Sequence, residues 1–407
     1  MGEYLLRCVR DGSVQPPYSL SCPKDGSLLR AFYQAMQLRI KEAPGIWRFM
    51  DWLPVHGIID GAGGAPVTYK SSGLAAELGL ECLYISYSGY WPERGAQMPT
   101  CSFKDLEAAP TMQMLRERGK QPTLVVASAG NTARAFAHMA SISGQPTVLF
   151  VPERSLSRMW LTEQPGPVKL IAVKGDYYDA IEVAEKVQSL PGYVAEGGAR
   201  NIARRDGMGT VVLDAALAIG RIPGHYFQAV GSGTGGISAW EAAMRLLDDG
   251  RFGSHMLRLH LAQSLPNAPI YFSWRGVDPA PPSPQVFDDV LFNRKPPYAV
   301  SGGVKDALLA TNGEVYGITE GEAEQAKKLF EESEGIDILN APAVAVAALQ
   351  QAVASGEVCS KDTILLNITG GGAARIKEDH VLHMLQPDLI VSRGGWERAV
   401  SFLEGSS

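Results

Sequence analysis

The chain has 407 residues, of which 45 % are hydrophobic, and this composition excludes an intrinsically disordered protein. Because this length exceeds what one compact core usually holds, it predicts two domains. The formal net charge is −6, from 37 basic and 43 acidic residues, which argues against nucleic acid as the main partner.

The N-terminal residues Met1–Cys8 lack the cationic start, apolar run and cleavage site of a secretory signal. The longest apolar stretch, Ala343–Leu349, is far shorter than the roughly 20 residues that span a bilayer, and it predicts a buried helix. Five cysteines in a chain of this length are typical of a reducing compartment. We therefore expect a cytoplasmic protein with neither membrane nor nucleic acid as a partner.

Residues 1–60 predict an N-terminal arm with a ribbon-like segment and one helix, Ser27–Ile40. The segments Cys8-Val9-Arg10-Asp11 and Cys22-Pro23-Lys24-Asp25 each resemble half of a zinc ribbon in which Asp replaces the second cysteine. Tight zinc sites prefer four Cys or His ligands. Two cysteines with two aspartates therefore favour a ribbon that folds without a metal.

Beyond the arm, short β-branched runs alternate with amphipathic stretches, which predicts a parallel α/β sheet. The predicted strands are Cys82–Ser86, Thr123–Ala127, Thr147–Val151, Val168–Val173, Tyr226–Val230, Leu257–Ala262 and Thr363–Ile368. The predicted helices include Thr132–Ile142, Tyr177–Ser189, Thr210–Ile219, Ser238–Leu247 and Gly321–Ser333. The proline-rich stretch Gly276–Pro297 forbids helix and central strand alike, so it predicts a long surface excursion.

Lys104 is the first candidate for chemistry. It lies in Ser102-Phe103-Lys104-Asp105, between a turn at Pro99 and the helical stretch Leu106–Arg118, so it is expected to project from the first turn of that helix. A lysine on a rigid element can present its amine to a carbonyl carbon and form a Schiff base. A lysine by itself is usually a solvated surface charge. The Schiff-base interpretation of Lys104 therefore depends on the motifs that follow it in the sequence.

The turn Ser128-Ala129-Gly130-Asn131-Thr132 follows a predicted buried strand and opens a helix. Backbone N–H groups at a helix N-terminus bind anions, which makes this a seat for a substrate carboxylate, assisted by the hydroxyls of Ser128 and Thr132. Asn131 can hydrogen-bond the phenolic oxygen of a pyridine ring. An ordinary helix cap is the simpler alternative.

A glycine loop, Gly231-Ser232-Gly233-Thr234-Gly235-Gly236, joins a predicted strand to the next helix. Small residues allow successive N–H groups to surround a phosphate. The loop lacks the Gly-Lys-Ser/Thr ending of a P-loop and the acidic residue of a dinucleotide site. A tight structural turn is the alternative.

Thr369 ends the last predicted strand and precedes three glycines. Its hydroxyl can donate to a pyridine nitrogen, where many enzymes that use pyridoxal phosphate (PLP) have Asp or Arg. A neutral partner leaves that nitrogen unprotonated, which suits elimination and replacement better than transamination. Together, the lysine, the Asn turn, the glycine loop and Thr369 predict PLP as cofactor and an amino acid as substrate.

At these residues the chain resembles the fold-type II PLP enzymes, and within them the threonine synthase family. Ser102–Asp105 is similar to that family's lysine motif, Ser128–Thr132 to its Ser-Gly-Asn-Thr loop, and Gly231–Gly236 to its phosphate loop. Gly207–Pro223 and Asn340–Leu349 are similar to two of its helices. The resemblance implies the two-domain α/β fold of the tryptophan synthase β-subunit, with mostly parallel sheets flanked by helices, in a homo-oligomer.

We expect residues 61–104 and 193–407 to form the large, PLP-phosphate-binding domain and residues 105–192 the small domain. The resemblance implies that Lys104 carries PLP and that Asn131, Thr369 and the glycine loop contact the cofactor. It also implies that Ser128 and Thr132 bind the substrate. The loop residues are Gly231, Ser232, Gly233, Thr234 and Gly235.

Within the family, Ser88–Ala96 and Ser102–Ala108 most resemble the branch of methanogenic archaea that makes L-cysteate from O-phospho-L-serine (phosphoserine) and sulfite, on a route to coenzyme M. Leu106-Glu107 stands where threonine synthases have Arg-Gly, and Gly64-Ala65-Pro66-Val67 lacks the Thr of their Gly-x-Thr-Pro-Leu turn. The resemblance implies a β-replacement in which Lys104 also moves the Cα proton.

Three cations, Lys70, Arg134 and Arg375, are candidate contacts for the departing phosphate and the incoming sulfite, although a solvated charge is the simpler interpretation of each. A threonine synthase acting on O-phosphohomoserine is the main alternative function. A cysteine synthase, a serine dehydratase and a non-catalytic paralogue that binds an amino acid are the others.

Overall fold

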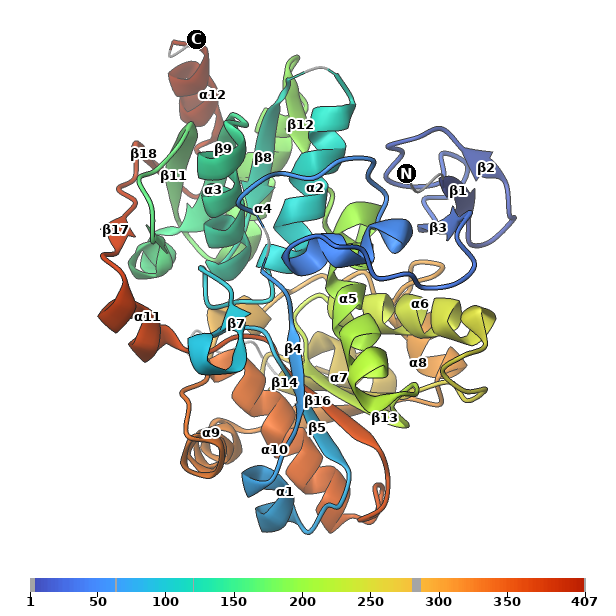
Figure 1. The fold of residues 1–407 in the computed structure, drawn as a ribbon. Helices are drawn as coiled ribbons and strands as arrows, with labels where there is room; N and C mark the ends of the chain where they lie inside the picture. The colour runs from blue at the N-terminus through green and yellow to red at the C-terminus, as the bar shows by residue number, and fades with distance from the viewer. Residues whose placement is uncertain (1–3, 63, 120, 280–286, 406–407) are drawn as a thin grey trace.

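The computed structural model describes residues 4–405 except 63, 120 and 280–286. It contains two larger sheets of mostly parallel strands flanked by helices, and a small antiparallel sheet at the N-terminus (Figure 1). The α/β architecture that the alternating pattern predicts is therefore confirmed. Among the residues described, no helix is both long and apolar enough to cross a membrane.

The larger sheet has six strands in the order β15-β14-β13-β16-β5-β4, and every neighbouring pair is parallel except β4 and β5. Its strands are β4 (Val67–Lys70), β5 (Leu83–Tyr87), β13 (His225–Ala229), β14 (Arg258–Ser264), β15 (Glu314–Ile318) and β16 (Ile364–Ile368). The helices of this part of the chain are α1 (Gly73–Leu78), α5 (Ile202–Ile219), α6 (Thr234–Asp249), α7 (Pro269–Arg275), α8 (Val304–Ala310), α9 (Glu320–Glu334) and α10 (Asn340–Ala354). The central strands β13, β14 and β16 are buried over almost their whole length because helices cover both faces of the sheet.

The second sheet has five parallel strands in the order β12-β8-β9-β11-β18. They are β8 (Thr123–Ala127), β9 (Thr147–Pro152), β11 (Val168–Lys174), β12 (Tyr193–Ala195) and β18 (Leu389–Ser392). Helices α2 (Asp105–Glu117), α3 (Asn131–Ser143), α4 (Tyr177–Gln188) and α12 (Trp396–Glu404) surround it, and α11 (Ala373–Asp379) lies on the path back from the larger sheet (Figure 1).

Two strands of the smaller sheet come from segments that the predicted division assigned to the large domain. Residues 193–195 pair with β8, and residues 389–392 pair with β11. The C-terminal strand covers an edge of β11 that otherwise presents unpaired N–H and C=O groups. The sequence pattern does not predict this return, because β18 is four residues long and far from β11 along the chain.

The seven predicted strands all form, with their ends shifted by at most two residues. Helix α5 begins at Ile202, well before the predicted start at Thr210, because the side chain of Asn201 accepts a hydrogen bond from the backbone of Arg204 and caps the helix. The early start of α5 matters because it places Arg204 on a helix that faces the pocket described below.

The N-terminal ribbon forms, but the predicted helix Ser27–Ile40 is wrong. The sheet has the order β2-β1-β3, built from β1 (Tyr4–Cys8), β2 (Val14–Gln15) and β3 (Leu29–Tyr33). Within β3, Leu29, Ala31 and Tyr33 are buried and alternate with more exposed residues, which is the period of a strand. The helical segment of the arm is instead the 3₁₀ helix η1 (Gly45–Trp52).

The arm is fastened to the larger sheet through α5 and α6, which it adjoins in Figure 1. Arg205 on α5 is fully buried and donates to the carbonyl of Leu29 and, at 2.9 Å, to Glu241 on α6. Arg30 of β3 reaches the same carboxylate at 3.3 Å. These contacts fix α5, the helix that carries Arg204.

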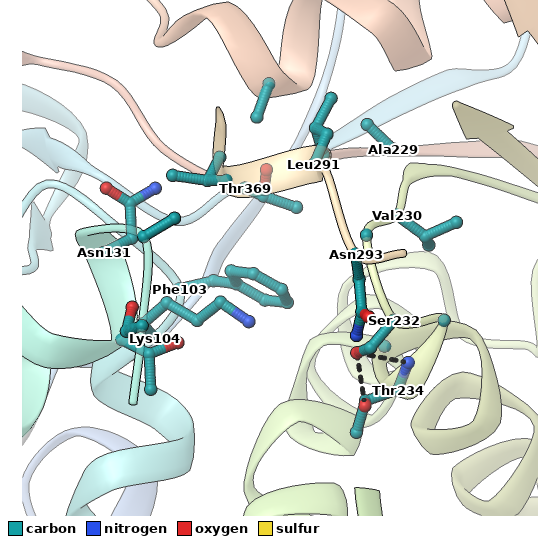
Figure 2. Close-up of a pocket in the computed structure, with 18 of the residues that line it drawn as sticks. Phe103, Lys104, Asn131, Ala229, Val230, Ser232, Thr234, Leu291, Asn293 and Thr369 are labelled. Carbon is teal, nitrogen blue, oxygen red and sulfur yellow. Dashed lines mark hydrogen bonds between the residues drawn. The ribbon is translucent and has the colours of Figure 1, made fainter. Parts of the chain in front are cut away.

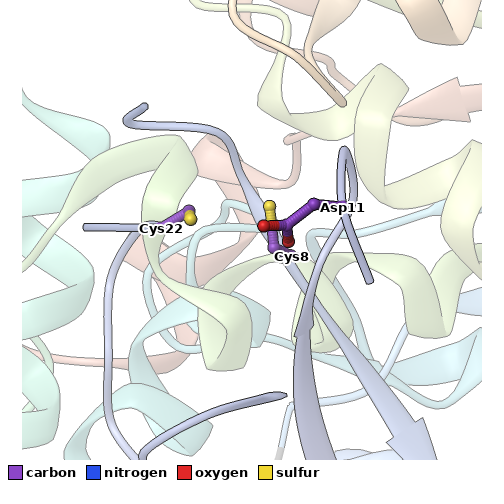
Figure 3. Close-up of side chains that lie close together, drawn as sticks. All are labelled: Cys8, Asp11 and Cys22. Carbon is purple, nitrogen blue, oxygen red and sulfur yellow. The ribbon is translucent and has the colours of Figure 1, made fainter. Parts of the chain in front are cut away.

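The two half-motifs of the ribbon lie together, and Cys8, Asp11 and Cys22 each place one ligand atom within 4.8 Å of the others (Figure 3). Both aspartates are already paired with cations from the opposite turn. Lys24 donates to Asp11 at 2.8 Å, and Arg10 to Asp25 at 3.4 Å. These crossed ion pairs join the two turns where a ribbon with four cysteines would use a metal.

We predict that the purified protein contains zinc well below one ion per chain and that a chelator leaves its melting temperature unchanged. The double variant Asp11→Cys/Asp25→Cys is expected to bind about one zinc ion, because it restores the four-thiolate set that zinc prefers. Metal analysis and thermal melts with and without chelator measure both. Stoichiometric zinc in the unaltered protein, with a melting temperature that falls on chelation, contradicts the prediction.

Candidate active site

One pocket brings together the catalytic, cofactor-binding and carboxylate-binding residues that the four motifs predict. It is lined by Lys104, Ser128, Asn131, Thr132, Gly231, Ser232, Gly233, Thr234, Gly235 and Thr369. The Asn turn, the glycine loop and Thr369 follow the carboxyl ends of β8, β13 and β16, where parallel α/β sheets bind ligands. In Figure 2, the Lys104 side chain extends into the space between Asn131 and the Ser232–Thr234 loop.

Lys104 immediately precedes α2, and its side chain is 20 % exposed. Its amine donates to Glu107 Oε2 at 3.3 Å and lies 4.5 Å from the centre of the Phe103 ring. Burial lowers the pKa of Lys104, and the Glu107 carboxylate opposes that shift only in part. A lowered pKa leaves a larger share of the amine neutral, which is the form that attacks a carbonyl carbon.

The backbone of the lysine segment is hydrogen-bonded to the strand end that carries Thr369. Phe103 N–H donates to the Thr369 carbonyl at 3.0 Å, and Gly371 N–H donates to the Cys101 carbonyl at 3.1 Å. Between them, Ser102 and Gly370 form an antiparallel bridge. Residues far apart in the sequence thus hold Lys104 and the Thr369 hydroxyl beside one pocket.

Arg134 joins the lysine segment to the Asn turn. Its guanidinium donates to the Thr100 carbonyl at 2.7 Å, to the Arg158 carbonyl at 3.0 Å and to Asn131 Oδ1 at 3.3 Å. With its oxygen held by Arg134, the Asn131 side chain turns its amide nitrogen toward the pocket (Figure 2). That nitrogen is a donor for a phenolic oxygen.

None of the three candidate anion contacts lines this pocket. Arg134 lies behind the Asn turn, Lys70 is an exposed residue of β4, and Arg375 pairs with Glu93 and, at 2.9 Å, with Asp379. A role for Lys70 or Arg375 in anion binding has no geometric support here.

The glycine loop lies between β13 and the N-terminus of α6, whose first turn carries no acidic residue. Gly233 caps the helix with a φ of +81°, and an added Cβ there would lie 2.3 Å from Val304. At Gly235 an added Cβ would lie 2.1 Å from the Gln228 amide. Close packing behind the loop therefore excludes side chains, and the loop N–H groups and the hydroxyls of Ser232 and Thr234 fit a cofactor phosphate.

Two important residues of this site were not predicted from the sequence: Arg204, which lines the pocket, and Glu107, which accepts the hydrogen bond of Lys104. Arg204 lines the pocket and forms ion pairs with Glu107 at 2.9 Å and with Glu196 at 2.7 Å. Burial lowers the pKa of Arg204, but the two carboxylates outweigh burial and raise it. The sequence does contain a signal for Arg204. Asn201, three positions earlier, is a typical N-cap residue and indicates that the helix starts before the predicted Thr210.

The proline-rich stretch is only partly the surface excursion that the sequence predicts. Residues 280–286 of it lie outside the described residues. The segment that follows returns to the protein, and Val290, Leu291 and Asn293 line the pocket, with Leu291 only 6 % exposed. The prolines predicted an irregular backbone correctly, but irregular backbone also forms one wall of the pocket.

Residues 59–370 match the family model described as "Pyridoxal-phosphate dependent enzyme". The chain belongs to this family, and PLP is its cofactor, as the motifs predict.

Among its relatives, the chain is 57 % identical over 411 residues to the cysteate synthase of Methanothrix thermoacetophila, with 99 % of each chain covered. It is 57 % identical over 394 residues to that of Methanococcoides burtonii, which covers 96 % of this chain and 94 % of the relative. It is 51 % identical over 407 residues to that of Methanosarcina mazei, which covers 96 % and 97 %. These findings confirm the resemblance to the branch of methanogenic archaea.

We predict that Lys104→Ala abolishes the visible absorbance of lysine-bound PLP and lowers turnover by roughly 10³-fold or more, because the variant lacks both the covalent link and the base. Thr369→Ala is expected to keep that absorbance while lowering kcat, because we expect its hydroxyl to contact the ring nitrogen and not the aldehyde. Absorption spectra and steady-state rates measure both. Turnover retained by Lys104→Ala, or loss of bound PLP from Thr369→Ala, contradicts the assigned roles.

We predict that Gly233→Ala weakens PLP binding by about tenfold or more, since a Cβ there overlaps Val304 and displaces the phosphate loop. Gly250→Ala is the matched control, because Gly250 ends the same helix with a φ of +77° and open space around it. Both variants lose roughly 1–2 kcal/mol of stability from the left-handed backbone. PLP affinity of the apoprotein, measured by fluorescence titration, should fall only for Gly233→Ala; an equal effect at both glycines contradicts the phosphate-loop role.

Proposed function

We propose that the protein makes L-cysteate and inorganic phosphate from O-phospho-L-serine and sulfite, a PLP-dependent β-replacement. The observation that carries the proposal is one pocket in which Lys104, the Asn turn and the glycine loop meet an uncharged Thr369. The relatives named cysteate synthase, matched over nearly their whole length, support the choice of product. By the same resemblance, we propose that the cysteate feeds coenzyme M synthesis and that the protein is a homo-oligomer.

The pocket distributes the binding tasks among its walls. The loop Gly231–Gly235 and the N-terminus of α6 would hold the cofactor phosphate, Thr369 would donate to the ring nitrogen, and Asn131 Nδ2 to the phenolic oxygen. The Ser128 and Thr132 hydroxyls, with the N-terminus of α3, would receive the substrate carboxylate. When bound, PLP supplies an electron sink that stabilises negative charge at the substrate Cα.

Lys104 would hold the cofactor covalently between turnovers and, once free, take the proton from Cα and later return it. Its lowered pKa suits this work, because a neutral amine is the base. In the net reaction the Cβ–O bond breaks and phosphate leaves with the electron pair. Sulfite then donates its sulfur lone pair to Cβ and forms the C–S bond of cysteate, so that no oxidant or reductant is needed.

The neutral hydroxyl of Thr369 supports replacement over transamination. An acidic partner would keep the ring nitrogen protonated and strengthen the electron sink, which transamination requires. A hydroxyl gives a weaker sink, which is sufficient to expel a good leaving group such as phosphate from Cβ.

The test is to incubate the PLP-loaded protein with phosphoserine and sulfite, and separately with O-phosphohomoserine in water. Further mixtures contain phosphoserine with sulfide, and phosphoserine alone. We expect cysteate and an equal amount of phosphate from the first mixture only, as measured by mass spectrometry and a phosphate assay, and neither from the Lys104→Ala control.

Each alternative has its own product. Threonine from phosphohomoserine would make the protein a threonine synthase, cysteine from the sulfide mixture a cysteine synthase, and pyruvate from phosphoserine alone a dehydratase. Any of these in place of cysteate overturns the proposal.

A further inference from the structure

A second cavity, of about 300 Å³, adjoins the cofactor pocket on the other side of the Asn turn. Asn131 lines both cavities. The walls come from both halves of the protein. Arg134 and Arg158 belong to the part built on the smaller sheet, whereas Lys327 lies on α9, a helix of the part built on the larger sheet. A ligand in this cavity would therefore lie next to the Asn131 side of the cofactor site.

The cavity carries an excess of positive charge. Four cations line it, Arg134, Arg158, Lys327 and Lys377, against the two carboxylates of Asp288 and Asp337. We call it the basic cavity.

Both carboxylates of the basic cavity are already engaged. Asp288 accepts a hydrogen bond from Arg158 at 2.7 Å, and Asp337 accepts one from the backbone N–H of Ala373 at 2.8 Å. Arg158 is thereby neutralised. The neutral N–H donor leaves the charge of Asp337 in place, so Arg134, Lys327 and Lys377 face one remaining carboxylate.

The two lysines are the cations most available to a ligand. The Lys327 ammonium group donates to Asn340 Oδ1 at 3.2 Å and lies 3.8 Å from Glu331. The Lys377 ammonium group has no hydrogen bond or ion pair with any residue that the structure describes. Both keep N–H donors for an anion, since an ammonium group has three.

Arg134 adds a buried charge behind the cavity. It is 4 % exposed, its bonds go to carbonyl oxygens and to Asn131, and among the described residues it has no carboxylate partner. Burial lowers the pKa of Arg134 to about 10, so it remains charged at neutral pH. A fixed positive charge surrounded by protein acts more strongly than a solvated one.

We propose that the basic cavity binds a small divalent oxyanion of the sulfite and phosphate class, held by Lys327 and Lys377 in the field of Arg134. This inference rests on the proposed function and deepens it, since the reaction takes in one such anion and releases another. The uncapped N-terminus of the 15-residue helix α10, at Leu339 and Asn340, adds backbone donors to the same wall. The incoming sulfite is the occupant we favour, because it reacts only after phosphate has left Cβ and a site beside the pocket would hold it close to that carbon until then.

The first experiment uses inorganic sulfate, which has the charge and shape of the ligand class and does not react with PLP. Binding of sulfate to the PLP-loaded protein is measured by calorimetry for the unaltered chain, Lys327→Ala, Lys377→Ala and Lys328→Ala. Lys328 is the matched control, since it neighbours Lys327 on α9 but is 75 % exposed and pairs with Glu332 outside the cavity. We expect each cavity variant to weaken sulfate binding by about tenfold, and Lys328→Ala to leave it unchanged.

Circular dichroism melts confirm that the variants fold, and Lys377→Arg, which keeps the charge, is expected to retain sulfate binding. Sulfate binding that is absent in the unaltered protein, or equal in all variants, overturns the inference.

The second experiment identifies the occupant. If sulfite occupies the cavity, its KM rises about tenfold in the cavity variants while the KM for phosphoserine stays constant. If departing phosphate occupies it, the sulfite KM stays constant and product inhibition by phosphate weakens instead. If the unaltered protein makes no cysteate but sulfate binding still depends on the two lysines, the proposed function fails and the oxyanion site stands. If cysteate forms and none of these quantities changes, the site fails and the function stands.

Discussion

The active site depends on one short piece of backbone, Thr100–Lys104. On one side its N–H and C=O groups pair with the segment Thr369–Gly371 at 3.0 and 3.1 Å. On the other side, Arg134 takes the carbonyl of Thr100 and the side-chain oxygen of Asn131. Lys104, Thr369 and Asn131, to which we assign the contacts with the cofactor, are thus linked to one peptide segment. Backbone hydrogen bonds position Thr369, and the Arg134 side chain positions Asn131.

Charge is arranged around this segment in two different ways. Next to Lys104, Glu107, Arg204 and Glu196 form a buried chain of paired charges, in which each cation faces a carboxylate. Beyond the Asn turn, the basic cavity is lined by four cations and only two carboxylates, and Arg134 and Lys377 have no carboxylate ion-pair partner among the described residues. The balanced cluster is compatible with the proton transfer that we propose for Lys104. The unbalanced cavity suits the binding of an anion.

The motifs predicted the site better than the periodicity predicted the fold around it. Lys104, Asn131, the glycine loop and Thr369 were identifiable because each follows a strand end or opens a helix, and the carboxyl ends of parallel strands meet. The predicted helix at Ser27–Ile40 was wrong because a five-residue strand, β3, was hidden among residues that also suit a helix. Arg204 was missed because an N-cap side chain starts its helix earlier than the apolar pattern does.

The sequence by itself determined the class of fold, the cofactor and the motifs that line one pocket, because these depend on local turns whose chemistry can be recognised in a few consecutive residues. Only the tertiary structure decided which distant groups surround them. The return of β18 to the smaller sheet, the wall contributed by Leu291 and Asn293, and the meeting of Lys327 and Lys377 with Arg134 all join segments far apart in the chain. Such contacts depend on how elements pack, and no local pattern of residues encodes the partner that each will meet.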